Sequence, residues 1–112
     1  MVPALGSLAT GGKFVNKGFS SYNKFRNYYG KAGDGMEWHH IVERRMEGKF
    51  GAERIHHIDN MIRLPKDVHR KISGHYSSYN NDLGMTVRKW LNNKTFEEQY
   101  QYGLDVLKRH GY

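Results

Sequence analysis

A chain of 112 residues without cysteine has the length of one modest domain, and it can form neither disulfides nor thiolate metal sites. Its formal net charge of +7 favours a polyanion such as nucleic acid as partner, and it also suits an acidic protein. Aromatic residues make up 13% of the chain and can supply most of a core, while no stretch approaches the roughly 20 apolar residues of a membrane span.

The first segment of the chain, residues 1–12, consists mostly of small residues and glycine. It lacks the basic start and the apolar centre of a signal peptide. We therefore expect residues 1–12 to be a flexible linker from a larger protein, and residues 13–112 to form the folded domain.

A helix is expected within residues 13–30, where aromatic side chains recur at steps of three and four. Either Ser20 or Ser21 can cap it, because a serine hydroxyl accepts a hydrogen bond from an open backbone amide. We interpret the aromatic residues as core, in preference to a surface on which bases would stack.

Two adjacent histidines follow a tryptophan in the expected first strand, Met36–Val42. Histidine is the commonest metal ligand, and its unperturbed pKa near neutrality suits it to general-base catalysis. Adjacent strand residues point to opposite faces, so His39 and His40 can address one site only if the strand begins, bends or bulges there. Taken alone, the pair favours the plainer interpretation, two histidines on a half-exposed strand, because a short motif is only a hypothesis until its context supports it.

A polar connection at Glu43–Gly51, with room for one helical turn, should lead to a second strand or irregular hairpin arm at Ile55–Leu64. His56 and His57 lie in this arm. We interpret them as exposed hairpin residues that can touch phosphate, in preference to metal ligands.

Pro65 should open a helix that runs to about Tyr76, because a first helical residue needs no amide hydrogen. Asp67 would then lie in the first turn, where the helix dipole favours a negative charge. His69 falls early in this helix. His75 is poorly spaced to share a ligand with it, so we expect His75 on the surface or behind the metal ligands.

In the C-terminal third of the chain, the sequence predicts a loop at Ser77–Gly84, a short helix at Met85–Leu91 and a final helix that ends near Arg109. Thr95 and Glu98 form a capping box at the start of that final helix. Its buried stripe is expected to consist of apolar and aromatic side chains, namely Phe96, Tyr100, Leu104 and Leu107.

The order His39-His40, Asn60 and His69 resembles the H-N-H motif of the HNH nucleases of the His-Me finger (ββα-metal) superfamily. More narrowly, residues 35–107 look like the WHH-type and endonuclease VII-like toxin domains at the C-termini of bacterial polymorphic and contact-dependent inhibition toxins. The resemblance implies an α+β fold with a ββα-metal core, a short hairpin plus helix, flanked by N- and C-terminal helices.

The same resemblance implies a role for each motif residue. His40 would be the general base, and His39 and His69 would be metal ligands. Asn60 would either brace the hairpin over the helix or give its carbonyl oxygen to the metal. A nearby cation is expected to lower the pKa of His40 and so to keep it neutral.

Ser73 departs from the pattern, because colicin-type relatives place a further histidine there. His75 is the nearest substitute, and Glu43 is a candidate for orienting a histidine. The divalent metal stays open among Mg, Mn, Zn and Ni, since imidazole favours transition metals and oxygen ligands favour Mg. Basic residues near the motif are candidate phosphate contacts, each of which can equally be a solvated surface residue: Arg44, Arg45, Arg70 and Lys71.

The resemblance therefore implies a metal-dependent endonuclease that cleaves phosphodiester bonds, with DNA expected in preference to RNA. It would act in the target-cell cytoplasm as the toxin domain of a larger secreted or surface protein from a bacterium, with an acidic cognate immunity protein. Two alternatives remain open. A metal-independent RNase toxin would use His40 with another histidine and would resist EDTA, and a non-catalytic basic nucleic-acid-binding module would bind without turnover.

Overall fold

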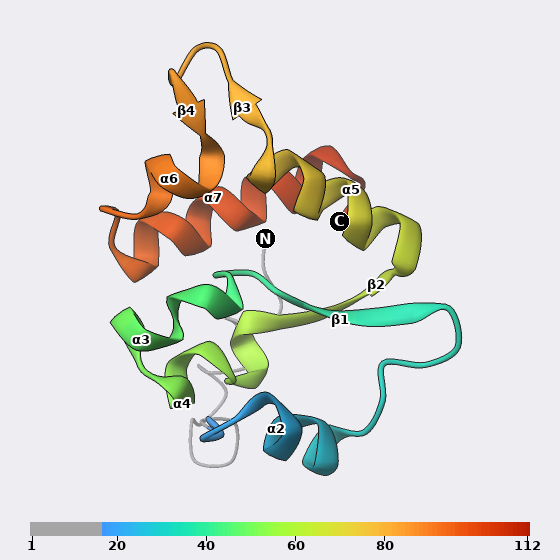
Figure 1. The fold of residues 1–112 in the computed structure, drawn as a ribbon. Coiled ribbons are helices and arrows are strands. Elements are labelled where there is room, and N and C mark those ends of the chain that lie inside the picture. The colour runs from blue at the N-terminus through green and yellow to red at the C-terminus, as the bar shows by residue number, and fades with distance from the viewer. Residues whose placement is uncertain (1–16) are drawn as a thin grey trace.

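A computed structural model describes residues 17–112, so the expected linker at 1–12 lies outside the described residues. The described chain is a mixture of helices and short antiparallel strands, in agreement with the predicted α+β class (Figure 1). Over that same range no helix combines the length and the apolar character that crossing a membrane requires.

The central hairpin pairs β1 (Met36–His40) with β2 (Met61–Pro65) in an antiparallel sheet. Each residue of β1 has a partner in continuous register, with His39 opposite Ile62 and His40 opposite Met61. No third strand from residues 17–112 joins this sheet, so the outer edge of β1 is unpaired. The first strand was predicted two residues too long, since the chain leaves the sheet after His40.

The predicted second strand, Ile55–Leu64, is wrong in its first half. Its early residues instead complete α4 (Ala52–Ile55) and form the 3₁₀ turn η2 (Ile58–Asn60). His57 favours this turn, because its ring nitrogen Nδ1 accepts a hydrogen bond from the backbone amide of Asp59 at 3.1 Å. The polar connection before α4 forms η1 (Arg44–Met46) and α3 (Glu47–Phe50), as the expected helical turn.

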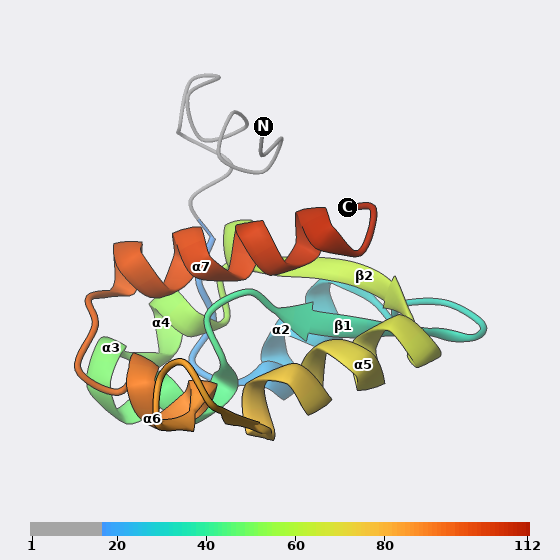
Figure 2. The same ribbon diagram turned by 90° about the horizontal axis from the view of Figure 1, so that it is seen from above.

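The helix α5 (Lys66–Ser77) follows β2 directly, and the predicted helix is confirmed to within one residue at each end. Pro65 stands at the N-cap instead of the first helical position. The helix lies along one face of the hairpin and buries Ile72 and Tyr76 against it (Figures 1 and 2). Strand, strand and helix thus succeed one another in the chain and pack together.

The helix α2 (Tyr22–Tyr29) covers the opposite face of the hairpin (Figure 1). Ser21 caps it, as one of the two predicted serines, by accepting a hydrogen bond from the amide of Lys24. Phe25 is fully buried and meets the ring of Trp38 edge to face, with ring centroids 5.0 Å apart. Phe25 is therefore core, and the half-buried Phe19, Tyr22 and Tyr29 pack against it as predicted, whereas Tyr28 is exposed. The hairpin is layered between α2 and α5.

The remaining elements form the C-terminal layer. A small hairpin of β3 (Tyr79–Asn80) and β4 (Met85–Thr86) projects from the body where a plain loop was expected (Figure 1). The helix α6 (Val87–Leu91) follows, and α7 (Phe96–Arg109) begins with the predicted capping box. This layer packs on the same core as α5.

The buried face of α7 differs in part from the predicted stripe. Tyr100 and Leu107 are buried as expected, whereas Leu104 is only half-buried and Val106 is buried in its place. Gly103 brings α7 close to the hairpin, because a Cβ atom built there would lie 2.6 Å from the carbonyl oxygen of Ile41.

Substitution of Gly103 by alanine should therefore lower the free energy of unfolding by about 1–3 kcal/mol, because the added methyl group overpacks the contact with Ile41. Gly74 is the matched control, since it lies inside α5 with no atom within 4 Å of its Cβ position. Gly74→Ala should stabilise the protein by about 0.5–1 kcal/mol through helix propensity. Urea denaturation of both variants checks this, and equal stabilisation of the two would contradict it.

Candidate active site

A cleft of about 580 Å³ runs along the unpaired edge of β1. Its walls come from α2, the loop before β1, β1 itself, the connection after it, and α5. The ionisable side chains that line it include three histidines, three basic residues and two carboxylates, namely His39, His40, His69, Arg26, Lys31, Arg44, Glu37 and Glu43.

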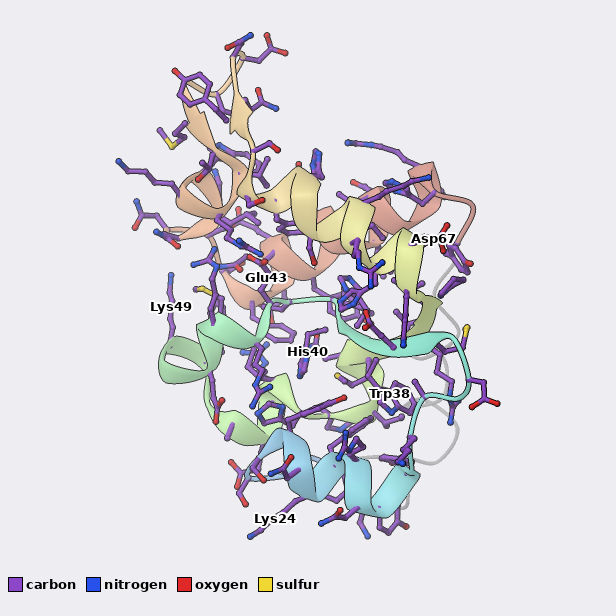
Figure 3. All side chains as sticks on the ribbon, turned by 45° about the vertical axis from the view of Figure 1, so that its right-hand side comes forward. Lys24, Trp38, His40, Glu43, Lys49 and Asp67 are labelled. Carbon is purple, nitrogen blue, oxygen red and sulfur yellow. The ribbon has the colours of Figure 1, made fainter. Side chains whose placement is uncertain are left out.

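The two adjacent histidines reach this cleft from opposite faces of β1. His39 points toward α5, where its ring lies against that of His69 with centroids 5.2 Å apart. His40 lies on the α2 side with Trp38 (Figure 3), and its ring is 5.6 Å from that of Tyr22. Because the strand ends at His40 and its edge is open, side chains from both faces line one cleft. The strand neither begins nor bulges at this pair, as the sequence analysis had required, but ends there, and this end together with the open edge lets both histidines line one cleft.

His69 is held by a carboxylate that the sequence analysis did not single out. Its Nδ1 atom lies 2.7 Å from Oε1 of Glu37, and this hydrogen bond is the main reason that the pKa of Glu37 is lowered. An ionised carboxylate only accepts, so Nδ1 of His69 donates this hydrogen bond and Nε2 is the ring nitrogen not engaged by Glu37. Glu37 precedes His39 by two strand positions, and the period of a strand was the signal that could have found it.

His39 is buried, and burial together with the neighbouring His69 lowers its pKa to about 3. Its ring is therefore neutral near pH 7, the state in which imidazole binds a metal. Its Nε2 atom is buried and has no hydrogen-bond partner within residues 17–112. An unsatisfied imidazole nitrogen beside a carboxylate-oriented histidine fits the donor set of a divalent metal.

The two histidines would nevertheless hold such an ion only at an open site. Within the described part of the chain, no group of three or more His, Asp or Glu side chains is arranged to hold a metal ion. Ser73, which the resemblance of the motif aligns with a further histidine of colicin-type nucleases, does line the cleft. Water and substrate oxygens would have to fill the remaining coordination positions, as they do at catalytic metal sites.

His40 has a partner that corrects the sequence analysis. His56 was expected to be an exposed hairpin residue, but it is fully buried, and its Nδ1 atom lies 3.1 Å from Nε2 of His40. The surrounding packing of α4 against the hairpin buries it, whereas His57 stays half-buried. Burial is the largest cause that lowers the pKa of His40 to about 3, followed by His56 and His39, and the guanidinium of Arg44 contributes less.

Asn60 is buried and uses its whole side-chain amide on the backbone. Its Oδ1 accepts the amide of Val42 at 2.8 Å, and its Nδ2 donates to the carbonyl oxygens of Val42 and Ile55. Of the two roles predicted for Asn60, this geometry favours the brace of the hairpin. Its oxygen is directed at the Val42 amide and not toward His39 or His69.

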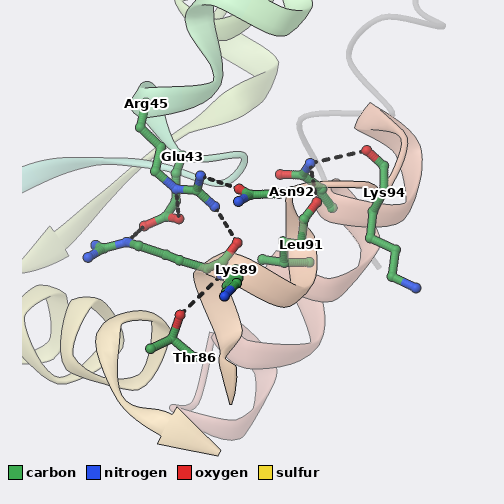
Figure 4. Close-up of polar contacts among 9 residues, drawn as sticks. Glu43, Arg45, Thr86, Lys89, Leu91, Asn92 and Lys94 are labelled. Carbon is green, nitrogen blue, oxygen red and sulfur yellow. Dashed lines mark hydrogen bonds and ion pairs between the residues drawn. The ribbon is translucent and has the colours of Figure 1, made fainter. Parts of the chain in front are cut away.

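Two predicted supporting residues are engaged elsewhere. Glu43 lines the cleft, but its carboxylate accepts hydrogen bonds from Arg45 at 2.9 Å and Arg88 at 2.8 Å (Figure 4). His75 packs against α7, with its Nε2 atom 2.7 Å from the hydroxyl of Tyr102. The histidine-orienting role predicted for Glu43 belongs to Glu37 in this structure, and His75 does not substitute for the missing third histidine.

The predicted phosphate contacts divide in the same way. Arg44 lines the cleft, with its guanidinium 5.1 Å from the centroid of the Tyr22 ring. Arg45 instead links Glu43 to α6 through hydrogen bonds to the Asn92 side chain and the Arg88 carbonyl oxygen. The exposed Arg70 and Lys71 of α5 are not among the described residues that line the cleft.

Two basic residues of the cleft wall, Arg26 and Lys31, were missed by the sequence analysis as phosphate contacts. Arg26 lies one helical turn after Tyr22, so both side chains share the face of α2 that borders the cleft. Helical spacing alone could have placed them together, but nothing in the sequence showed which face of α2 borders the histidines.

Comparisons with protein-family models, with curated proteins and with solved structures found no match to this chain. A function for it has to be argued from the motif and from the geometry of the cleft.

Replacement of Asn60 by alanine should lower the free energy of unfolding by about 2–4 kcal/mol, because it leaves buried backbone groups of Val42 and Ile55 without partners. Asn93→Ala, at an exposed position between α6 and α7, is the control and should change stability by less than about 0.5 kcal/mol. Denaturant unfolding of both variants measures this. A stable Asn60→Ala protein with weakened metal binding would instead favour the ligand role.

Proposed function

We propose that this chain is a metal-dependent endonuclease of the HNH type, with a ββα-metal core formed by β1, β2 and α5. The observation that carries the proposal is the meeting of His39, His40 and His69 at one cleft with basic walls. A module that only binds phosphate needs the positive charge but not three histidines that meet at one cleft, one of them oriented by a carboxylate. The non-catalytic alternative is therefore less well supported.

In the proposed reaction, His40 is the general base that takes a proton from the attacking water. Its lowered pKa keeps the ring neutral near pH 7, so that a ring nitrogen has a lone pair available for that proton. His39 and His69 would hold the divalent metal, with Glu37 orienting His69. A bound metal would supply stabilisation of the charge that develops on the phosphate and on the leaving oxygen.

The basic residues of the cleft would hold the nucleic-acid backbone. Arg26, Lys31 and Arg44 line the cleft, and each presents a positive charge that phosphate contacts require. The guanidinium of Arg44 also lies over the ring of Tyr22, which holds it at the cleft wall. We propose DNA as the substrate, in preference to RNA.

The resemblance of the motif to bacterial toxin domains supports a role in competition between bacteria. We propose that the chain is the toxin domain of a larger secreted or surface protein and acts in the cytoplasm of the target cell. The net charge of +7 would favour an acidic immunity protein as its inhibitor.

The second candidate is a metal-independent RNase. It is supported by His40 and His69, which both line the cleft and would serve as a base and acid pair. His56 cannot be the acid, because it is fully buried and has no access to a substrate. Resistance of the activity to EDTA, together with a preference for RNA, would favour this candidate over the DNase.

The test is a plasmid-nicking assay with EDTA, and with Mg, Mn, Zn or Ni added back. Nicking should depend on metal, and His40→Ala should lower it by roughly 10²- to 10⁴-fold. His69→Ala should weaken metal binding measured by calorimetry. His75→Ala is the matched control, because His75 is on the same helix as His69 but faces Tyr102.

Intact plasmid under every metal would overturn the DNase proposal, and the assay would then move to tRNA and ribosomal RNA. Loss of nicking in His75→Ala as large as in His69→Ala would show that α5 histidines act through stability, which thermal unfolding of both variants would reveal.

Arg44 and Arg45 offer a second test within one pair of neighbouring residues. Arg44→Ala should weaken DNA binding. It should also reduce the slope of log K, the logarithm of the binding constant, against the logarithm of the salt concentration by about one unit, because one phosphate contact is lost. Arg45→Ala removes the same charge but should leave that slope unchanged and cost at most about 1 kcal/mol of stability, since its side chain is bonded to Glu43 and α6. Equal effects of the two substitutions on binding would contradict a phosphate role for the cleft.

A further inference from the structure

His56 is a polar side chain that the proposed reaction does not use, and yet it is fully buried. Burial of an imidazole costs free energy unless its nitrogens are compensated. Its Nδ1 atom faces Nε2 of His40 at 3.1 Å, and its Nε2 atom lies 3.3 Å from Oε1 of Glu47. A buried histidine thus connects the proposed base to a carboxylate on α3, outside the cleft lining.

The carboxylate sets the direction of this chain of contacts. A carboxylate has no proton to donate, so its charge favours the His56 tautomer with the hydrogen on Nε2, facing Glu47. The contact at 3.3 Å lacks hydrogen-bond geometry, since Nε2 has no hydrogen-bond partner within the described chain. The bias is therefore electrostatic. The burial of the His56 ring strengthens it, whereas solvent partly screens the carboxylate of Glu47, whose side chain is 40% exposed.

The tautomer of His56 fixes that of His40. With its hydrogen on Nε2, His56 presents a bare Nδ1 lone pair, which accepts the hydrogen bond from Nε2–H of His40. His40 then keeps its lone pair on Nδ1, the ring nitrogen not engaged by His56. The opposite arrangement would place hydrogen on Nδ1 of His40 and leave that atom unable to accept a proton.

We propose that Glu47 and His56 are positioning residues that hold His40 as the tautomer whose Nδ1 accepts the proton of the attacking water. This inference rests on the proposed function, since it assumes that His40 is the base. The ring of Tyr22 lies beside both histidines, with centroids 5.6 Å from His40 and 6.4 Å from His56, and covers their contact on the α2 side.

Glu47→Gln is the sharpest variant, because the glutamine amide can donate to Nε2 of His56 and reverse the chain of hydrogen bonds. Glu47 has a side chain that is 40% exposed, so the substitution should leave the fold intact. We expect kcat for DNA cleavage to fall by roughly 10- to 100-fold, as on loss of other residues that orient a histidine, with KM unchanged. Glu53→Gln, at an exposed position on α4, is the matched control and should leave kcat unchanged.

Two substitutions of His56 separate its hydrogen bond from its packing. His56→Asn keeps a carbonyl oxygen near the position of Nδ1 and should retain more activity than His56→Leu, which keeps bulk but no acceptor. His57→Asn is the control on the neighbouring histidine, whose ring contacts the Asp59 amide and not His40. Thermal unfolding shows whether His56→Asn and His56→Leu are equally stable. If they are equally stable and also have equal kcat, the positioning role is overturned.

Ring-nitrogen NMR of His40 at mildly alkaline pH tests the tautomer without any enzymatic assay. The wild-type protein should carry its ring hydrogen on Nε2, and Glu47→Gln should shift the population toward Nδ1. A wild-type ring protonated on Nδ1 would overturn the positioning role even if the protein cleaves DNA. Failure of the wild-type protein to cleave DNA under any metal, with the Nε2 tautomer present, would overturn the proposed function and leave the tautomer assignment standing.

Discussion

The hydrogen bonds of the Asn60 side chain are the constraint on which the geometry of the cleft depends. They join the backbone of Val42, just after β1, to the end of α4 at Ile55. Because buried amide groups must find hydrogen-bond partners, the two chain segments that Asn60 joins have one well-defined relative position. It brings the end of β1, with His40, against the end of α4, where His56 follows Ile55. A single asparagine therefore determines where the proposed base meets its buried partner.

The two-stranded sheet has a second consequence for the site. A strand at the centre of a larger sheet would hide its edges, but β1 has an open edge, so residues from both faces line the cleft. His39 on one face is associated with His69 and Glu37, and His40 on the other face with His56. In the proposed mechanism, these faces separate metal binding from proton transfer, each with its own supporting carboxylate.

The positive charge of the chain is divided between structure and the cleft. Arg45 and Arg88 are bonded to Glu43, and Arg54 is paired with Glu97 and lies over the ring of Phe96. Such pairs join the connection after β1 to the C-terminal helices. Of the cations at the cleft wall, Arg26 and Lys31 lie on the N-terminal side, in α2 and the loop after it, and Arg44 lies just after β1, in η1. Net charge alone predicts a polyanion partner, but it does not indicate which cations would meet it.

The sequence by itself determined the features that depend on near neighbours in the chain. The capping box at Thr95, the cap at Ser21 and the extent of α5 were predicted because their hydrogen bonds and helical periods join residues three or four apart. The candidate histidines of the cleft were also found from sequence, through the order of residues in the motif.

Only the tertiary structure decided which residues support those histidines. His56 was taken for an exposed residue because its burial depends on α4 packing against the hairpin, a contact between distant parts of the chain. For the same reason the sequence did not show that Arg26 lines the cleft, or that the carboxylate of Glu43, which also lines it, is bonded to arginines from two different segments. The local sequence determines the helical periods and the helix caps. The burial, the pKa and the charge partners of a side chain depend instead on neighbours that only folding brings together.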